Sequence, residues 1–262
     1  MIRSAWVALN LALATFFFGI IAIVGSLLRV RGRLYYWATQ QWSRAVLWAS
    51  NVPVFAHGMR GIDWNRPQVL VSNHVSFYDV FALAGILPAP YAFVAKQELE
   101  RIPFFGMAWK AAGHISVDRS NRARAVQSLR HAAESIRTRR STVIIFPEGT
   151  RSLTGEMLPF KKGAFMLASE AGVPVIPVIV RGSAEIQRPG SLRIHPREVH
   201  VYFGEPLDPA EFAGQGVEPF IAATRARMEG MLASTRGDLT AKDSKDAKDD
   251  ENAGERTMEI RE

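Results

Sequence analysis

Apolar residues follow two different patterns along the chain, and the change falls near Gly58. Before it, residues 5–28 form an apolar run without a charged residue. A run of this length can cross the hydrocarbon core of a bilayer, which takes about 20 helical residues, and it is too long for a typical signal-peptide core. The pattern therefore predicts a membrane-anchoring helix at the N-terminus.

The flanks of this run indicate where it lies. Three arginines fall between residues 29 and 33, whereas only Arg3 precedes the run. The positive-inside rule then places the rest of the chain in the cytoplasm, on the inner (cytoplasmic) membrane. Residues 34–55 mix tyrosines and tryptophans with Arg44, which favours a helix in the headgroup zone. The alternative is that both segments are buried helices of a soluble domain.

After Gly58, short apolar runs alternate with longer amphipathic ones, which predicts an α/β fold with a mixed sheet flanked by helices. The clearest helix pattern is 122–139, where Val126, Leu129, Ala133 and Ile136 share one face. The expected strands are QVLVS (68–72), YAFVA (91–95), HISV (114–117), TVIIF (142–146), VPVIPVIV (173–180) and EVHVYF (198–203).

Two prolines change the expected position of one of these strands in the sheet. Pro174 and Pro177 lie in the run 173–180, and a proline cannot donate to a strand ladder. We therefore expect this strand not to occupy a central, fully paired position in the sheet.

Charge is distributed unevenly over the 262 residues. The formal net charge is +7, but residues 237–262 carry nine Asp or Glu against five Lys or Arg, a net of −4 that leaves +11 on the remainder. A basic body favours anionic partners such as phosphate-bearing substrates, nucleic acid or anionic membranes. The tail has little apolar content and is expected to be disordered. The predicted organisation is membrane-associated helices over 1–57, an α/β domain over 58–236 and an acidic tail over 237–262.

A first polar cluster, NHVSFYD (73–79), interrupts apolar sequence directly after the strand at 68–72. Ser76 and Asp79 have the spacing of a helix capping box, which is the purely structural interpretation. His74 and Asp79 would lie about 140° apart on a continuous helix, so they can pair only if the chain turns between them. In α/β sheets, ligands usually bind beyond the carboxyl ends of the strands. His74 and Asp79 are therefore candidate catalytic residues.

Two further clusters also end strands. GHISVDRS (113–120) ends with Asp118 and Arg119, and IIFPEGTRS (144–152) ends with a Glu-Gly-Thr-Arg sequence. Each could be an ordinary surface turn. The chain has no cysteine, which excludes disulfides and a cysteine nucleophile, and the six histidines have no metal-ligand spacing, so we predict no metal.

The order N-H-x-S-x-x-D, G-x-I-x-V-D-R, F-P-E-G-T-R-S and V-P-V-I-P-V over about residues 50–210 resembles the membrane-associated glycerolipid acyltransferases, specifically the bacterial 1-acyl-glycerol-3-phosphate acyltransferase type. The resemblance implies a glycerol-3-phosphate acyltransferase-like fold. One departure is Ser116, where many relatives carry a bulky apolar residue.

The resemblance also implies roles for particular residues. His74 would be the general base and Asp79 the carboxylate that orients it, which agrees with histidine chemistry near neutral pH. The family pattern assigns acceptor binding to EGTR, and arginine can bind a phosphate bidentately. The expected substrate-binding residues are Glu148, Gly149, Thr150, Arg151, Arg119 and Lys96.

The expected function is transfer of an acyl chain from acyl-CoA or acyl-carrier protein to lysophosphatidic acid, giving phosphatidic acid without a cofactor. The expected partners are these substrates, acyl-carrier protein and a phospholipid membrane. One alternative keeps the chemistry with another lysolipid or glycerol 3-phosphate as acceptor. Another is a basic membrane-surface or nucleic-acid-binding protein without catalysis. Few aromatic residues accompany the basic clusters after Gly58, so nucleic acid is not an expected partner.

Overall fold

The computed structural model describes residues 2–30, 33–118, 127–129, 132–134, 136, 138, 141–187, 191 and 193–235. The acidic tail and Arg119 lie outside the described residues. The α-helices are α1 (Ile2–Leu27), α2 (Arg33–Ser50), α3 (Tyr78–Ile86), α4 (Phe105–Ala111), α6 (Gly163–Ala171), α7 (Ser183–Ile186) and α8 (Glu218–Ser234). Short 3₁₀ helices are η1 (Met59–Gly61), η2 (Gln97–Arg101) and η3 (Pro209–Phe212).

One mixed sheet forms the centre of the molecule. Its strands are β1 (Val54–His57), β2 (Val69–Ser72), β3 (Tyr91–Lys96), β4 (Ile115–Val117), β5 (Thr142–Ile145), β6 (Val175–Arg181) and β7 (Val199–Phe203). Their order is β1-β7-β6-β2-β5-β3-β4, and every neighbouring pair is parallel except β6 and β7. The mixed α/β fold predicted from the sequence is therefore confirmed, and all six expected strands are present.

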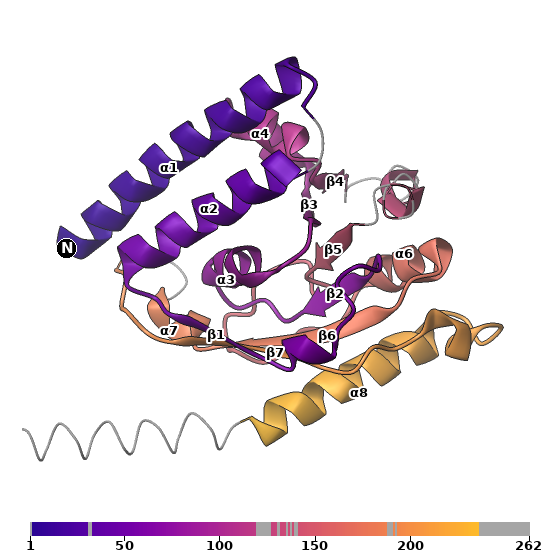
Figure 1. Ribbon diagram of the computed structural model, residues 1–262. Helices are drawn as coiled ribbons and strands as arrows, with labels where there is room; N and C mark the ends of the chain where they lie inside the picture. The colour runs from indigo at the N-terminus through magenta and orange to yellow at the C-terminus, as the bar shows by residue number, and fades with distance from the viewer. Residues whose placement is uncertain are drawn as a thin grey trace, which may run out of the picture.

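Strand side chains alternate between two apolar cores. Leu70 and Ile144 face the core that α2 and α3 cover, whereas Val69 and Val143 face the core under α6 and α8. Figure 1 shows the resulting layers, with α1 and α2 outside α3 on one side and α8 along the other. Both faces are covered, which is why the strands read as continuous apolar runs in the sequence.

The expectation for the proline-containing strand was wrong about its place in the sheet, although its pairing with β7 is interrupted at Pro177. β6 lies inside the sheet between β2 and β7. Pro177 is tolerated because two residues of β6 face three of the opposite chain, between the Val175↔Leu207 bridge and the Val178↔Phe203 pair. Such a bulge leaves no ladder partner for the missing N–H group, while the Pro177 carbonyl still accepts from Gly204 N at 2.8 Å.

The sheet begins before the domain boundary predicted at residue 58. β1 lies at 54–57 and pairs with β7 along its whole length. Its sequence, VFAH, is too short to show alternating apolar and polar positions. As the edge strand next to β7, β1 is also largely exposed, so it lacks the apolar run of a buried strand.

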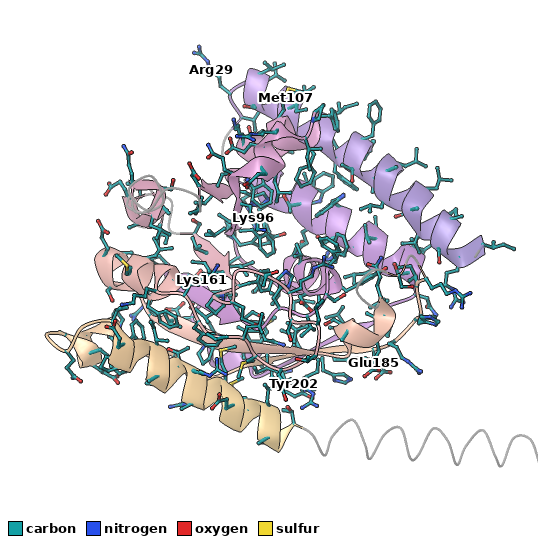
Figure 2. All side chains as sticks on the ribbon, turned by 180° about the vertical axis from the view of Figure 1, so that it is seen from behind. Arg29, Lys96, Met107, Lys161, Glu185 and Tyr202 are labelled. Atoms are coloured by element: carbon teal, nitrogen blue, oxygen red, sulfur yellow. The ribbon has the colours of Figure 1, made fainter. Side chains whose placement is uncertain are left out.

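The two N-terminal helices pack on the α/β domain. Trp42 Nε1 in α2 donates to Thr15 Oγ1 in α1 at 3.0 Å, and Ile194 N donates to Ser4 Oγ near the start of α1 at 3.2 Å. The outer face of α1 carries exposed apolar side chains: Trp6, Leu9, Leu13, Phe16, Phe17, Ile20 and Val24. Arg29 and Met107 lie at the end of the molecule where α1 meets α4 (Figure 2). This helix is long and apolar enough to cross a membrane.

Gly182, between β6 and α7, offers a test of the local backbone. Its φ is +84°, and an added Cβ would lie 2.1 Å from the Glu198 carbonyl oxygen. Gly182→Ala should therefore lower the free energy of unfolding by at least about 2 kcal/mol, from left-handed strain and the clash together.

The matched control is Gly172→Ala, because Gly172 has φ +65° and no atom near the added Cβ. It should lose only about 1 kcal/mol, the cost of left-handed strain. Denaturant unfolding of both variants measures the difference. Equal losses would show that the Glu198 carbonyl moves aside.

Candidate functional site

The end of β2 fixes the first residue of the site. Asn73 is buried, and its side chain donates to the Val180 carbonyl at 3.0 Å and accepts from Val180 N at 2.7 Å. The amide thereby continues the pairing of β2 with β6 by one residue after the strand has ended. His74 follows at the carboxyl edge of the sheet, where ligands bind in α/β folds.

His74 and Asp79 meet across the turn that leads into α3. His74 Nδ1 lies 2.8 Å from Asp79 Oδ2, and α3 begins only at Tyr78. The chain therefore turns between the two residues, as their pairing requires. The capping interpretation holds as well, because Val75 N and Ser76 N both donate to Asp79 Oδ2 at 2.8 Å.

Asp79 is fully buried and receives a further hydrogen bond on its other oxygen. Ser183 Oγ, at the start of α7, donates to Oδ1. Asp79 Oδ2 already accepts hydrogen bonds from Val75 N and Ser76 N, so it is an acceptor for His74 as well. This arrangement favours a proton on His74 Nδ1, which then donates to Oδ2. That tautomer leaves the lone pair of the imidazole on Nε2.

Glu148 ties the second polar loop to His74. Its Oε1 accepts from His74 N and its Oε2 from Leu158 N, each at 2.9 Å. Ser152 N donates to the His74 carbonyl at 2.8 Å. Burial raises the pKa of the Glu148 carboxyl, and the two N–H donors oppose that rise. Both oxygens of the Glu148 carboxylate accept from backbone N–H groups, so its geometry suits a positioning role, and its predicted part in substrate binding stays a prediction.

Aromatic rings complete the surroundings of His74 and Arg151. The Phe146 ring stacks on the His74 imidazole, with centroids 4.0 Å apart and 17° between planes. The guanidinium of Arg151 lies over the Phe77 ring, 3.9 Å from its centroid. This cation–π contact holds the charge beside the His74 turn, where an anionic ligand can reach it.

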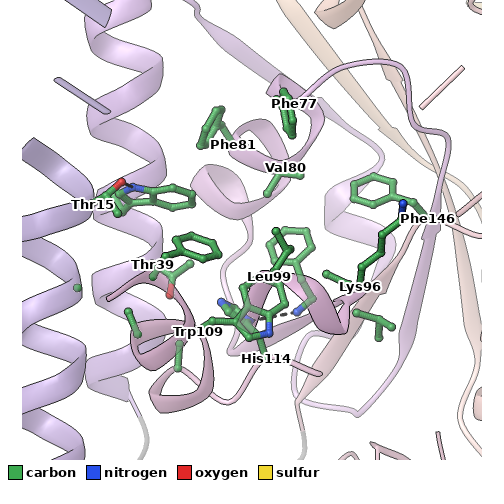
Figure 3. A pocket seen from close by; sticks show the side chains of 18 of the residues that line it. Thr15, Thr39, Phe77, Val80, Phe81, Lys96, Leu99, Trp109, His114 and Phe146 are labelled. Carbon is green, nitrogen blue, oxygen red and sulfur yellow. Dashed lines mark hydrogen bonds between the residues drawn. The ribbon is translucent and has the colours of Figure 1, made fainter. Parts of the chain in front are cut away.

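A cavity of about 510 Å³ opens next to His74. Its walls come from α1, α2, α3, β3, α4 and the loop after β5, and they are mainly aromatic and aliphatic (Figure 3). Phe77 and Phe146 lie near its polar edge together with Lys96, Gly149, Thr150 and Arg151. This shape suits an apolar chain with an anionic or polar group at the edge.

The structure brings most of the sequence-predicted site residues together. His74, Lys96, Gly149, Thr150 and Arg151 all line the cavity. The call on Arg119 falls on a residue outside the described part of the chain. Among the described residues, no group of three or more His, Asp or Glu is arranged to hold a metal ion.

Sequence reasoning missed three contributors to the site. Ser183 carries no motif signal, because its partner Asp79 is far away in sequence. Phe146 belonged to the expected strand TVIIF and to the F-P-E-G-T-R-S pattern, but it was given no role. His114 follows Gly113 in the second motif and lines the cavity, with its Nδ1 accepting from Phe93 N at 3.2 Å. Nearby, Trp109 Nε1 donates to the hydroxyl of Ser116, which gives the departure from the family pattern a hydrogen-bonding role.

His114 also generates a pH prediction. Burial lowers the pKa of its imidazole from 6.5 to about 4. The unfolded chain binds a proton near the ordinary value while the folded chain resists it, so this residue should cost stability as pH falls from 6.5 to about 4.

In His114→Asn, whose amide oxygen can still accept from Phe93 N, the free energy of unfolding should therefore fall less steeply across that window. Denaturant titrations at a series of pH values measure the slope. An unchanged slope in the variant would mean that the folded protein also protonates His114.

The site combines a histidine–carboxylate pair with an apolar cavity at the carboxyl side of a mixed sheet, which suits acid–base chemistry on a substrate that carries an apolar chain. The family model described as "Acyltransferase" matches residues 51–181. This chain belongs to that acyltransferase family.

Curated relatives are named 1-acyl-sn-glycerol-3-phosphate acyltransferase. The protein of Cocos nucifera is 30% identical over 215 residues, covering 82% of this chain and 68% of the relative. That of Escherichia coli strain K12 is 35% identical over 165 residues, covering 63% and 66%. That of Limnanthes douglasii is 32% identical, and this chain spans only 62% of its length.

A solved structure agrees in fold. It is the crystal structure of the 1-acyl-sn-glycerophosphate (LPA) acyltransferase from Thermotoga maritima. The TM-score is 0.69 at 29% identity, and the match covers 87% of this chain and 96% of that one. The enzyme class and fold expected from the sequence are thus confirmed, and the non-catalytic alternative is set aside.

Proposed function

We propose that the protein transfers a fatty acyl chain from acyl-CoA or acyl-carrier protein to the sn-2 hydroxyl of 1-acyl-glycerol 3-phosphate, giving phosphatidic acid. The observation that carries the proposal is the His74–Asp79 pair at the edge of the apolar cavity, with Arg151 beside it. The printed names of the relatives support the same acceptor.

The proposed reaction is direct transfer. The acceptor hydroxyl oxygen attacks the thioester carbonyl carbon, so that a C–O bond forms while the C–S bond breaks. His74 Nε2 takes the hydroxyl proton and then returns it to the leaving thiolate. Asp79 accepts a hydrogen bond from His74 Nδ1–H and stabilises the imidazolium as it forms, without taking the proton itself. The thioester is already activated, so no acyl-enzyme is required and no cofactor is proposed.

The phosphate of the acceptor would bind Arg151. A phosphomonoester presents three terminal oxygens, which match the planar fork of a guanidinium. Arg151 is half-buried against Phe77, so an anion there is partly shielded from water. Lys96 lines the same cavity and would supply a second positive charge. A different lysolipid or glycerol 3-phosphate remains the alternative acceptor.

The catalytic proposal predicts that His74→Ala lowers kcat by at least about a hundredfold, because the base is lost. Asp79→Asn should lose as much, because an amide nitrogen in the place of Oδ2 would donate hydrogen bonds where the carboxylate oxygen accepts them. Ser183→Ala removes one of the four donors to Asp79 and should lose about tenfold or less.

Steady-state thioester release, with folding checked by thermal melting, measures all three variants. Full turnover by a folded His74→Ala protein would remove His74 from the mechanism.

The acceptor assignment predicts a selective effect at Arg151. Arg151→Ala should reduce kcat/KM for lysophosphatidic acid by a factor that corresponds to a loss of about 2 to 4 kcal/mol of transition-state stabilisation. Arg151→Lys should restore only part of it, because an ammonium lacks the planar fork. Lysolipids whose phosphate carries choline or ethanolamine should be poor substrates of the wild type.

Phe77→Leu serves as the matched control, because it removes the ring under Arg151 and keeps the charge. It should weaken use of lysophosphatidic acid by less than the loss of the arginine. Equal efficiency on masked and unmasked phosphates in the wild type would favour the broader lysolipid acceptor.

We also propose that the protein works on the cytoplasmic side of the inner membrane, with α1 in the lipid. The packing of α1 favours a helix embedded in one leaflet over one that crosses both. Its contacts run from Ser4, which accepts from Ile194 N, through Thr15, which accepts from Trp42 of α2, to Gly19 beside the Phe104 ring. A helix held along its length in this way suits a position beside the domain in one leaflet.

Membrane attachment should accordingly resist high salt and carbonate and yield to detergent, because it rests on apolar side chains. Replacing exposed Leu9, Leu13 and Phe17 by Ser should release much of the protein at high salt. Sedimentation of washed membranes measures the bound fraction. Release of the wild type by salt alone would show that only its positive charge holds it there.

A further inference from the structure

His114 is a polar residue of the cavity wall that the proposed reaction does not use. Most of the cavity's polar wall residues away from His74 are hydrogen-bonded within the protein. Trp42 Nε1 donates to Thr15 Oγ1 at 3.0 Å, and Thr39 Oγ1 donates to the Tyr35 carbonyl at 2.9 Å. Trp109 Nε1 donates to Ser116 Oγ at 3.1 Å. The imidazole of His114 differs from these groups, because only one of its nitrogens is engaged.

The backbone fixes which nitrogen of His114 carries the proton. Nδ1 accepts from Phe93 N, a backbone donor just before the first pair of β3 with β4. In a neutral imidazole the proton must then be on Nε2. Within the described part of the chain, no protein atom accepts a hydrogen bond from Nε2, and the ring lines the cavity.

A donor in such a place affects which ligand binds well. The ring lies against the side chains of Trp109 and Phe93, with centroids 4.3 and 5.9 Å away. An alkyl chain passing Nε2 would leave the donor without an acceptor, which is costly in an apolar site. A chain with an oxygen atom at that level would remove the cost, and sites built around such a bond reject analogues that lack the oxygen.

We propose that the Nε2–H of His114 binds an oxygen substituent on a fatty acyl chain, so that the cavity selects chains carrying a hydroxyl or keto group. The inference rests on the proposed function only in taking the cavity to hold an acyl chain. The reaction at His74 is unchanged.

The position of the oxygen follows from the ring contacts. From His74 the rings of Phe146, Phe93 and His114 succeed one another, with centroids 4.0, 6.4 and 5.9 Å apart. In Figure 3, His114 lies at the opposite side of the cavity from Phe77. The oxygen would therefore sit in the middle of the chain, beyond the carbons next to the thioester.

The test compares a plain stearoyl thioester with a mid-chain hydroxystearoyl thioester of CoA on the full-length protein in detergent micelles. His114→Asn keeps an acceptor for Phe93 N but withdraws the donor from the Nε2 position, whereas His114→Gln places an amide N–H close to it. Thr39→Val is the control, because the Thr39 hydroxyl is already bonded to Tyr35. The quantity measured is the ratio of kcat/KM for the hydroxylated donor to that for the plain donor.

The ratio should fall about tenfold in His114→Asn and stay within about threefold of the wild type in His114→Gln and Thr39→Val. A second arm pairs the plain donor with a lysophosphatidic acid whose own chain carries the hydroxyl. A fall confined to this arm would place the acceptor chain, and not the donor chain, against His114. An unchanged ratio in both arms would overturn the proposal.

A binding measurement separates this inference from the proposed reaction. Trp42 and Trp109 line the cavity, so their fluorescence reports the binding of free stearate and hydroxystearate. If no donor is turned over, the proposed function fails, yet tighter binding of hydroxystearate that is lost in His114→Asn would still support the role of His114. Equal affinities in both proteins would overturn it.

Discussion

The buried carboxylate of Asp79 is the group on which the site depends. It has no access to solvent, and a buried charge is tolerated only when protein donors replace the lost water. Those donors come from the turn after β2 and from the start of α7. Because α7 follows β6, the orientation of His74 depends on the pairing of β2 with β6. Asn73, which joins the ends of these strands, stabilises the same arrangement.

Hydrogen bonds fix His74 through its backbone as well as through its ring. Glu148 accepts from its N–H group, and Ser152 donates to its carbonyl, so the loop after β5 forms hydrogen bonds to both sides of the residue. The same loop carries Phe146 and Arg151. The loop after β5 therefore helps to position both the imidazole and the cation beside it, which suits the roles proposed for His74 and Arg151.

The N-terminal helices connect membrane attachment to the active site. Thr15 and Gly19 of α1 line the cavity, as do Thr39 and Trp42 of α2. The outer face of α1 is apolar and exposed. The helix that would contact lipid is thus also a wall of the cavity, so an acyl chain could pass between membrane and site without crossing water. His114 adds a polar group to this apolar path.

The sequence by itself determined the local features of this protein. Apolar runs located six of the strands and α1, and the spacing from His74 to Asp79 indicated a pair across a turn, because these signals arise from neighbours in the chain. Only the tertiary structure decided that Glu148 holds the backbone of His74, that Ser183 completes the Asp79 site, and that β6 lies inside the sheet despite Pro177. Each of these depends on groups far apart in sequence, and hydrogen bonds between such groups leave no periodic pattern along the chain.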